Sequence, residues 1–132
     1  MHKVTIVLTS AVAGGFFLFI LWVIYLANTG QPSIFFDFIR SMPYGDKVGH
    51  MGLFGVLTLL TNAATHFKTF RLWRWSVFSG TALVLTFVTL EELSQYFIPS
   101  RTLDIFDYSA DLAGILLFTW LSSRLANHLA AK

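Results

Sequence analysis

Acidic, basic and histidine side chains recur at helical spacing in separate parts of the chain. Asp46 and Lys47 precede His50 by four and three positions, and Glu92 precedes Gln95 by three. Residues three or four positions apart lie on one face of a helix. Each segment therefore presents a polar stripe that could bind a ligand, move a proton or pair with another stripe.

A third stripe follows on the C-terminal side. Asp104, Asp107 and Asp111 stand at positions i, i+3 and i+7, and Arg101 precedes them in a tight turn over residues 98–101. This turn brings Arg101 close to the carboxylates on both sides. The candidate ligand-binding or polar-cluster residues are Asp46, Lys47, His50, Glu92, Gln95, Arg101, Asp104, Asp107 and Asp111. No catalytic residue is assigned, and we expect neither a metal nor a cofactor.

The composition predicts what kind of elements position these groups. Of the 132 residues, 55% are hydrophobic and only 12% are charged, about half the charged fraction of a soluble domain. There is no cysteine, which excludes disulfides and thiolate chemistry. The net charge of +2 comes without a long basic run, so we expect no nucleic-acid partner. We expect an integral membrane protein.

Four mostly apolar runs approach the 20 residues that a membrane helix needs. The predicted fold is all-α, a compact bundle of four transmembrane helices in a single domain over residues 1–132. The helices are expected at residues 4–27, 48–67, 75–98 and 105–123. The first run is too long for a signal peptide and no A-x-A cleavage site follows it, so we expect an uncleaved helix.

Lysine and arginine set the expected orientation. The two ends of the chain and the second loop carry six of these residues, and the other two loops carry three. The positive-inside rule then places both termini in the cytoplasm. The predicted location is the bacterial inner (cytoplasmic) membrane, crossed several times.

The polar stripes should meet near the outer face. Counting about 1.5 Å per residue from the inner helix ends, His50, Glu92 and Asp107 lie roughly 26 to 27 Å away, in a hydrocarbon core of about 30 Å. Asp111 lies about one turn deeper. Charged groups at membrane depth face a bundle interior or a wet cavity.

Two connecting segments have a recognisable character. Residues 67–75 alternate basic and aromatic side chains, which is typical of an anchor at a lipid headgroup layer. Residues 33–41 are too short and too polar to span, so a short helix lying in the outer interface is expected there.

Three motifs in this order resemble those of the VanZ-like membrane proteins. They are D-K-x-x-H at 46–50, E-x-x-Q at 92–95 and P-x-R-x-x-D-x-x-D at 99–107, and Gly114 follows at the family's glycine position. The resemblance covers about residues 46–118. Two positions depart from it, because Asp111 replaces an expected asparagine and Phe118 a common glycine.

The resemblance implies a cell-envelope protein connected with resistance to teicoplanin-type glycopeptides, but no reaction. The residues themselves allow a site open to the outer leaflet. Lys47, Arg101 and His50 would hold an anionic headgroup, and the carboxylates would take hydroxyl, amine or glycopeptide groups. The expected ligand is a lipid headgroup, a cell-wall precursor or a glycopeptide.

Two alternatives remain open. In the first, the cluster is a salt-bridge network in a structural or assembly subunit. Lys47 would pair with Asp46 or Asp104, and Arg101 would pair with Glu92 or Asp107. It would suit a membrane-protein partner or a homo-oligomer. Or the protein is an intramembrane hydrolase or transferase. No nucleophile or metalloprotease motif supports an enzyme, so a binding or structural role is favoured.

Overall fold

A computed structural model of the chain describes residues 2–31, 33–99 and 101–132. The helices are α1 (His2–Asn28), α2 (Ile34–Ser41), α3 (Gly45–Ala64), α4 (Ser79–Ser94) and α5 (Ile105–Ala130), with a 3-10 turn η1 (Gln95–Phe97). Between α3 and α4 lies an antiparallel hairpin of β1 (Thr69–Leu72) and β2 (Trp75–Phe78).

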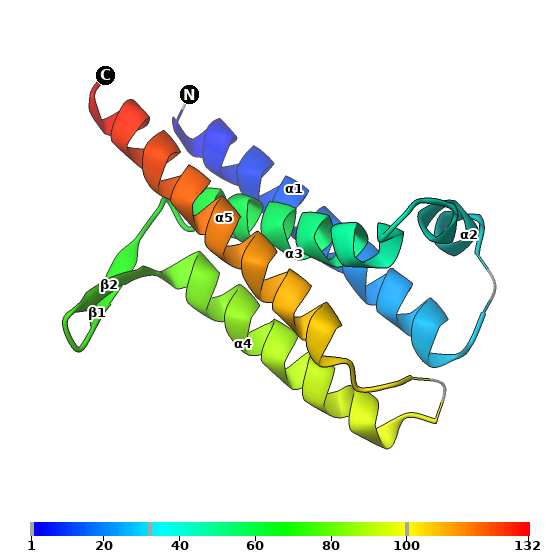
Figure 1. Cartoon of the computed structure of the whole chain (residues 1–132). Helices are drawn as coiled ribbons and strands as arrows, with labels where there is room; N and C mark the ends of the chain where they lie inside the picture. The colour runs from blue at the N-terminus through cyan, green and yellow to red at the C-terminus, as the bar shows by residue number, and fades with distance from the viewer. Residues whose placement is uncertain (1, 32, 100) are drawn as a thin grey trace.

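Helix α3 holds the molecule together. It packs most extensively on α5 and also contacts α1 and α4. Both termini and the hairpin lie at one end of the molecule, which we call the hairpin end (Figure 1). Helix α2 and the C-terminal end of α4 lie at the opposite end, the α2 end.

The apolar core lies where these helices meet. The fully or nearly fully buried side chains are Ile20, Phe54, Leu57, Val84, Val88 and Ile115. Phe17 of α1 meets Phe87 of α4 edge to face, with ring centroids 5.1 Å apart. Such edge-to-face pairs are favourable beyond the area that they bury. The core therefore draws on α1, α3, α4 and α5.

Glycines permit the close approach of α3 to its neighbours. A Cβ atom on Gly114 of α5 would collide with the backbone of Met51, and one on Gly55 would collide with the ring of Phe118. Gly52 is different, because nothing lies within 4 Å of the position of its Cβ. The α3–α5 contact therefore depends on Gly55 and Gly114 but not on Gly52.

A buried, uncharged polar group joins three helices toward the hairpin end. The Asn62 side chain donates to Thr81 Oγ1 and to Ser122 Oγ, each at 3.0 Å, and its Oδ1 accepts from Thr81 N at 2.9 Å. Thr81 Oγ1 lies 2.9 Å from Thr119 Oγ1. We call Asn62, Thr81, Thr119 and Ser122 the amide–hydroxyl cluster. Gly80 makes room for it, because a Cβ there would strike Asn62.

The predicted bundle of four membrane-spanning helices is wrong. Within the described residues, one helix is long and apolar enough to cross a membrane, over Lys3–Asn28 with a mean hydropathy of 2.3. Helix α4 has 16 residues, which is about 24 Å long and shorter than a hydrocarbon core of about 30 Å. Polar side chains inside α3 and α5 lower the hydropathy of those helices.

The error at residues 75–98 has a structural cause. This apolar run does not begin as a helix, because Trp75–Phe78 forms the second strand of the hairpin and Ser79 N donates to Lys68 O at 2.9 Å. It ends early as well, because η1 follows Ser94. Short apolar runs of this kind do not distinguish strand from helix by periodicity. The predicted all-α fold class is therefore also wrong in this detail, because the chain forms a β-hairpin between α3 and α4.

The predicted location is wrong for the same reason. A multi-pass inner-membrane protein with both termini in the cytoplasm requires several spans, and the described residues provide one candidate near the N-terminus. Helix α1 is itself mostly exposed, since only 11% of its most apolar window is buried. Its length and exposure fit a membrane anchor, and its place near the N-terminus is also that of a signal segment.

Candidate functional site

The sequence-predicted polar residues gather at the α2 end of the molecule. They come from the first turns of α3, the last turn of α4, η1 and the start of α5. We call the group the ionic cluster, including Glu91. Its members are Asp46, Lys47, His50, Glu91, Glu92, Gln95, Arg101, Asp104, Asp107 and Asp111.

Helix α2 positions the first of these residues. Gly45 begins α3 directly beneath Ile39, and a Cβ atom at Gly45 would overlap the carbonyl oxygen of Ile39. Tyr44, just before it, has a φ of 55° and turns the chain into α3. This tight connection fixes the first turn of α3 against α2, and thereby the positions of Asp46 and Lys47.

Lys47 is the cation that joins α3 to α5. Its Nζ lies 3.1 Å from Asp46 Oδ2 and 3.3 Å from Asp104 Oδ2, and it also pairs with Asp107. The hydrogen bond to Asp107, reinforced by the other two carboxylates, raises the pKa of Lys47. The bond from Lys47 in turn lowers the pKa of Asp46. Lys47 is therefore charged and fully engaged.

Asp104 connects α5 to α4. Its side chain caps α5 by accepting from Phe106 N at 2.8 Å, and this bond, with help from Lys47, lowers the pKa of Asp104. Its backbone N donates to Glu92 Oε1 at 3.1 Å. The Asp104 side chain, as the N-cap of α5, thus satisfies one of the free N–H groups of the first helical turn.

His50 pairs with Asp111, whose side chain is fully buried. His50 Nδ1 lies 2.8 Å from Asp111 Oδ1, and Nε2 lies 3.7 Å from Asp107 Oδ2. Burial lowers the pKa of His50, but the bond to Asp111 and the neighbouring carboxylates outweigh it, so the net shift is upward. Burial raises the pKa of Asp111, and the bond from His50 opposes that rise only in part.

One carboxylate oxygen of Asp111 lacks a hydrogen bond within the described residues. Its side chain is fully buried, and its Oδ2 has no hydrogen-bond partner among the residues that the structure describes. A buried polar atom without a partner costs free energy, so such atoms are rare in folded proteins. The resemblance to the VanZ-like motifs predicts an asparagine here. The chain instead has an acid, and one of its carboxylate oxygens accepts no hydrogen bond within the described residues.

Arg101 pairs with Glu91. Its Nη2 lies 3.4 Å from Glu91 Oε1, and its Nη1 donates to Asn28 Oδ1 at 2.7 Å. Gln95 Nε2 donates to both oxygens of Glu91, at 3.1 and 3.0 Å, and to Glu92 Oε2 at 3.3 Å. The α4–α5 connection is thereby tied to both α1 and α4.

Some of the predicted pairs are present and others are not. Lys47 contacts both Asp46 and Asp104, as the network alternative expected. The partners predicted for Arg101 were Glu92 and Asp107, but the described partner among the acids is Glu91. The E-x-x-Q motif at residues 92–95 favours Glu92 over its neighbour Glu91 as the site residue. The rotation of α4 about its own axis, set by packing, decides which acid faces Arg101.

Glu91 and Glu92 line different cavities of the molecule. Glu92 lines a groove of about 370 Å³ between α4 and α5, together with Thr89 and Tyr108, whose hydroxyl groups lie 2.8 Å apart. Burial raises the pKa of Glu92, and the bond from the Asp104 backbone opposes it. Glu91 faces the other side, toward α1.

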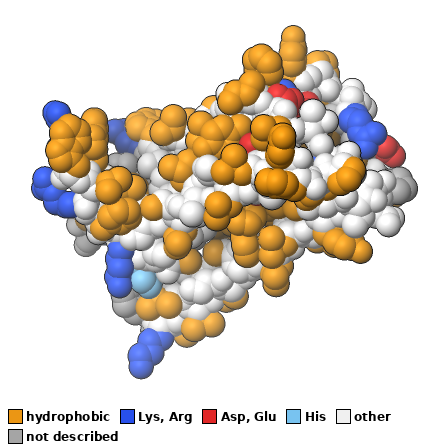
Figure 2. Space-filling view, turned by 90° about the horizontal axis from the view of Figure 1, so that it is seen from below, with side chains coloured by type: hydrophobic (Ala, Val, Ile, Leu, Met, Phe, Trp, Pro, Cys, Tyr) orange, Lys and Arg blue, Asp and Glu red, His pale blue; other side chains and the backbone are white. Residues whose placement is uncertain are grey.

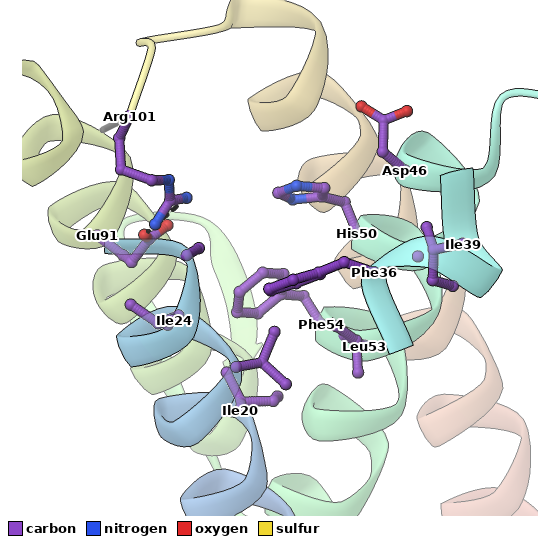
Figure 3. A pocket seen from close by; sticks show the side chains of 13 residues that line it. Ile20, Ile24, Phe36, Ile39, Asp46, His50, Leu53, Phe54, Glu91 and Arg101 are labelled. Carbon is purple, nitrogen blue, oxygen red and sulfur yellow. Dashed lines mark ion pairs between the residues drawn. The ribbon is translucent and has the colours of Figure 1, made fainter. Parts of the chain in front are cut away.

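A pocket of about 130 Å³ opens beside Glu91 and Arg101 (Figure 3). Figure 3 shows Glu91 and Arg101 on one side of it, and His50 and Asp46 on the other. The rest of the lining is apolar and comes from three helices, with Ile20 and Ile24 from α1, Phe36 and Ile39 from α2, and Leu53 and Phe54 from α3. The pocket therefore has an apolar body and a charged rim.

The ionic cluster holds more carboxyl groups than cations. Asp46, Glu91, Glu92, Asp104, Asp107 and Asp111 face Lys47, Arg101 and His50. Every one of these three basic side chains is already bonded to a carboxylate. Across residues 2–31, 33–99 and 101–132, no set of three His, Asp or Glu side chains is arranged to hold a metal ion.

Comparison of the chain with protein-family models, with curated proteins and with solved structures gave no significant match. The resemblance to the VanZ-like proteins therefore rests on the three motifs at residues 46–50, 92–95 and 99–107.

Proposed function

We propose that the protein binds an amphiphile through the pocket between α1, α2 and α3. The observation that carries this proposal is the division of the pocket lining into apolar walls and one charged rim. An apolar chain segment would lie against Ile20, Ile24 and Phe54, and a polar head would meet Asp46, His50 and Glu91. Sites for small molecules commonly combine apolar walls with a few placed polar groups.

The size of the pocket limits what it can enclose. A cavity of roughly 150 Å³ accommodates one benzene molecule, so about 130 Å³ takes only a few carbon atoms of a ligand. A whole glycopeptide is far too large for it. The proposed ligand is a lipid or a lipid-linked cell-wall precursor, in keeping with the motif resemblance. Its chain would enter the pocket next to the head and continue along the exposed side of α1.

The electrostatics favour a head that donates hydrogen bonds. An anionic head would have to compete with Asp107, Asp111 and Glu91 for cations that these groups already hold. An amine or a hydroxyl instead finds the carboxylate oxygens of Asp46 and Glu91 at the rim, and hydrogen bonds to charged acceptors contribute about 1.5 to 3 kcal/mol each. We therefore assign the head to the amine or polyol class.

The test uses three probes that share a twelve-carbon chain: dodecylamine, dodecane-1,2-diol and dodecyl phosphate. Native mass spectrometry of the full chain should show one bound amine or diol, with an affinity at least about tenfold above that of the phosphate. Glu91→Gln should weaken amine binding, whereas Asp37→Asn, an exposed change on α2, should not. Tightest binding of the phosphate would contradict the proposal.

A second function is favoured by one observation, the number of ion pairs that cross between elements. Lys47 joins α3 to α5, and Arg101 joins the α4–α5 connection to α4 and α1. In this alternative the ionic cluster is a structural network within a subunit of an assembly. The two functions differ in their readout. Glu91→Gln would then lower thermal stability without changing the affinity for any of the three probes.

A further inference from the structure

The hairpin end of the molecule carries a second surface, far from the ionic cluster. Figure 1 shows β1 and β2 projecting from the helices. All four residues of β1 are exposed, as are the first two of β2. An isolated two-stranded hairpin is only marginally stable in water, so a hairpin with this exposure gains from a partner that covers it.

The register divides the hairpin into two unlike faces. Phe70 pairs with Val77 and Leu72 with Trp75, and directly opposite residues of an antiparallel pair point to the same face. This face is entirely apolar, and Leu72 and Trp75 are 62% and 64% exposed. The opposite face carries Arg71 beside Ser76.

The tip places an aromatic ring where glycine would be easier. Trp73 and Arg74 form the two-residue turn, and Trp73 has a φ of 58°. Bulky side chains rarely adopt this left-handed conformation, which glycine adopts without cost. The Trp73 side chain is 76% exposed, with the Arg74 guanidinium 4.2 Å from the ring centroid. The tip thus presents an aromatic ring and a cation together.

The charge around the hairpin has one sign. No Asp or Glu occurs between residues 47 and 90 or after residue 111, whereas Lys68, Arg71 and Arg74 lie in or beside the hairpin. In the face seen in Figure 2, one end shows Lys and Arg side chains without acids, whereas the visible Asp and Glu side chains lie toward the other end, together with further Lys and Arg side chains. A two-fold dimer through the hairpin would bring this basic surface against itself, so the charge favours an anionic partner.

We infer that the hairpin docks on an anionic lipid surface, with Phe70, Leu72 and Trp75 entering the interface and Arg71 and Arg74 meeting the headgroups. Aromatic side chains concentrate at the level of lipid headgroups. Basic residues close to an anionic surface each contribute roughly fivefold to partitioning, and salt screens the effect. This docking surface is separate from the pocket and does not depend on its ligand.

The test measures how strongly the full chain partitions into vesicles. The chain has no native cysteine, so an environment-sensitive dye can be attached through Ser76→Cys on the hairpin or through Thr102→Cys at the α2 end. Vesicles containing phosphatidylglycerol should shift the emission of the hairpin dye to the blue at low salt, more than vesicles of phosphatidylcholine alone. The Thr102 dye should shift less.

Two variants separate the contribution of the hairpin to partitioning from that of α1, because every variant keeps α1 unchanged. The double change Arg71→Gln and Arg74→Gln should weaken partitioning into anionic vesicles about thirtyfold, and Arg40→Gln on α2 should leave it unchanged. Trp73→Gly relieves the positive φ and keeps the turn, yet it should weaken partitioning because the ring is lost. Retained cross-strand contacts in the spectra of this variant would show an intact hairpin.

Three results would overturn the inference. The first is equal partitioning into neutral and anionic vesicles. The second is a double variant that binds like the unmodified chain. The third is a blue shift of the hairpin dye that grows with protein concentration without vesicles, since a second copy would then be covering the apolar face.

Discussion

Two polar clusters join the helices of this protein, and they satisfy their hydrogen bonds in different ways. The amide–hydroxyl cluster around Asn62 is uncharged, and the Asn62 side chain uses both its amide nitrogen and its oxygen. The ionic cluster at the α2 end holds nine ionisable side chains. It includes a fully buried carboxylate oxygen, Asp111 Oδ2, that has no partner in the described part of the chain.

The difference separates a structural role from a binding role. A fully satisfied buried network rigidifies a core and needs nothing else. The carboxylates of Asp46 and Glu91 at the pocket rim offer acceptor oxygens that a ligand can use. We therefore expect changes in the amide–hydroxyl cluster to affect stability alone, and changes at the pocket to affect binding more than stability.

The largest expected effect on stability comes from Asn62→Ala. The change removes three hydrogen bonds in a fully buried position and leaves the N–H of Thr81 without an acceptor. The free energy of unfolding should fall by about 3 kcal/mol. Thr86→Ala, which removes an exposed hydroxyl that bonds its own helix, is the control for thermal or denaturant unfolding. Loss of probe binding at a temperature where the Asn62 variant is folded would contradict the comparison.

Lys47→Met should have a smaller effect. Lys47 pairs with three carboxylates, but its side chain and those of its partners are partly exposed. Solvent weakens such pairs, so the free energy of unfolding should fall by about 1 kcal/mol. Added salt should reduce the difference between the variant and the unmodified protein. A loss as large as that in Asn62→Ala would show that the ionic cluster is the main structural tie.

The pH dependence of stability gives a finer test. The pKa of His50 is raised in the folded protein, so its contribution is complete below the unfolded pKa of about 6.5 and disappears as the pH rises through the folded pKa. The thermal midpoint should therefore fall from about pH 6.5 upward. The raised pKa values of Asp111 and Glu92 act in the same direction.

His50→Gln should remove most of this pH dependence. His128→Gln, an exposed change near the end of α5, should leave it intact. The lowered pKa values of Asp46 and Asp104 act in the opposite sense and only in acid, where their stabilisation is lost as the pH falls. A thermal midpoint that increases as the pH is raised above 7 would contradict the raised pKa of His50.

The sequence predicts the gathering of the ionic cluster better than it predicts the elements. Helical spacing places Lys47 and His50 on one stripe and Asp107 and Asp111 on another, and the structure brings these stripes into contact. Spacing within a helix is local and follows from its geometry. The choice between Glu91 and Glu92 is not local, because it depends on how α4 is rotated against α1 and α5.

The membrane bundle was predicted wrongly because hydropathy adds residues along the chain without regard to their partners. Trp75–Phe78 counts as apolar whether it forms a helix or a strand. The hairpin depends on pairing with Thr69–Leu72, which composition does not show.

Binding of dodecylamine to two glycine variants of α3 tests the central claim most directly. Gly49 lines the pocket, and a Cβ there meets only the Ile39 side chain, at 3.8 Å, so Gly49→Leu should fill the pocket without breaking the helix. Gly52→Leu places the same side chain on the same helix outside it. Our account predicts that Gly49→Leu abolishes binding and Gly52→Leu preserves it. Equal binding by both variants would contradict an amphiphile site between α1, α2 and α3.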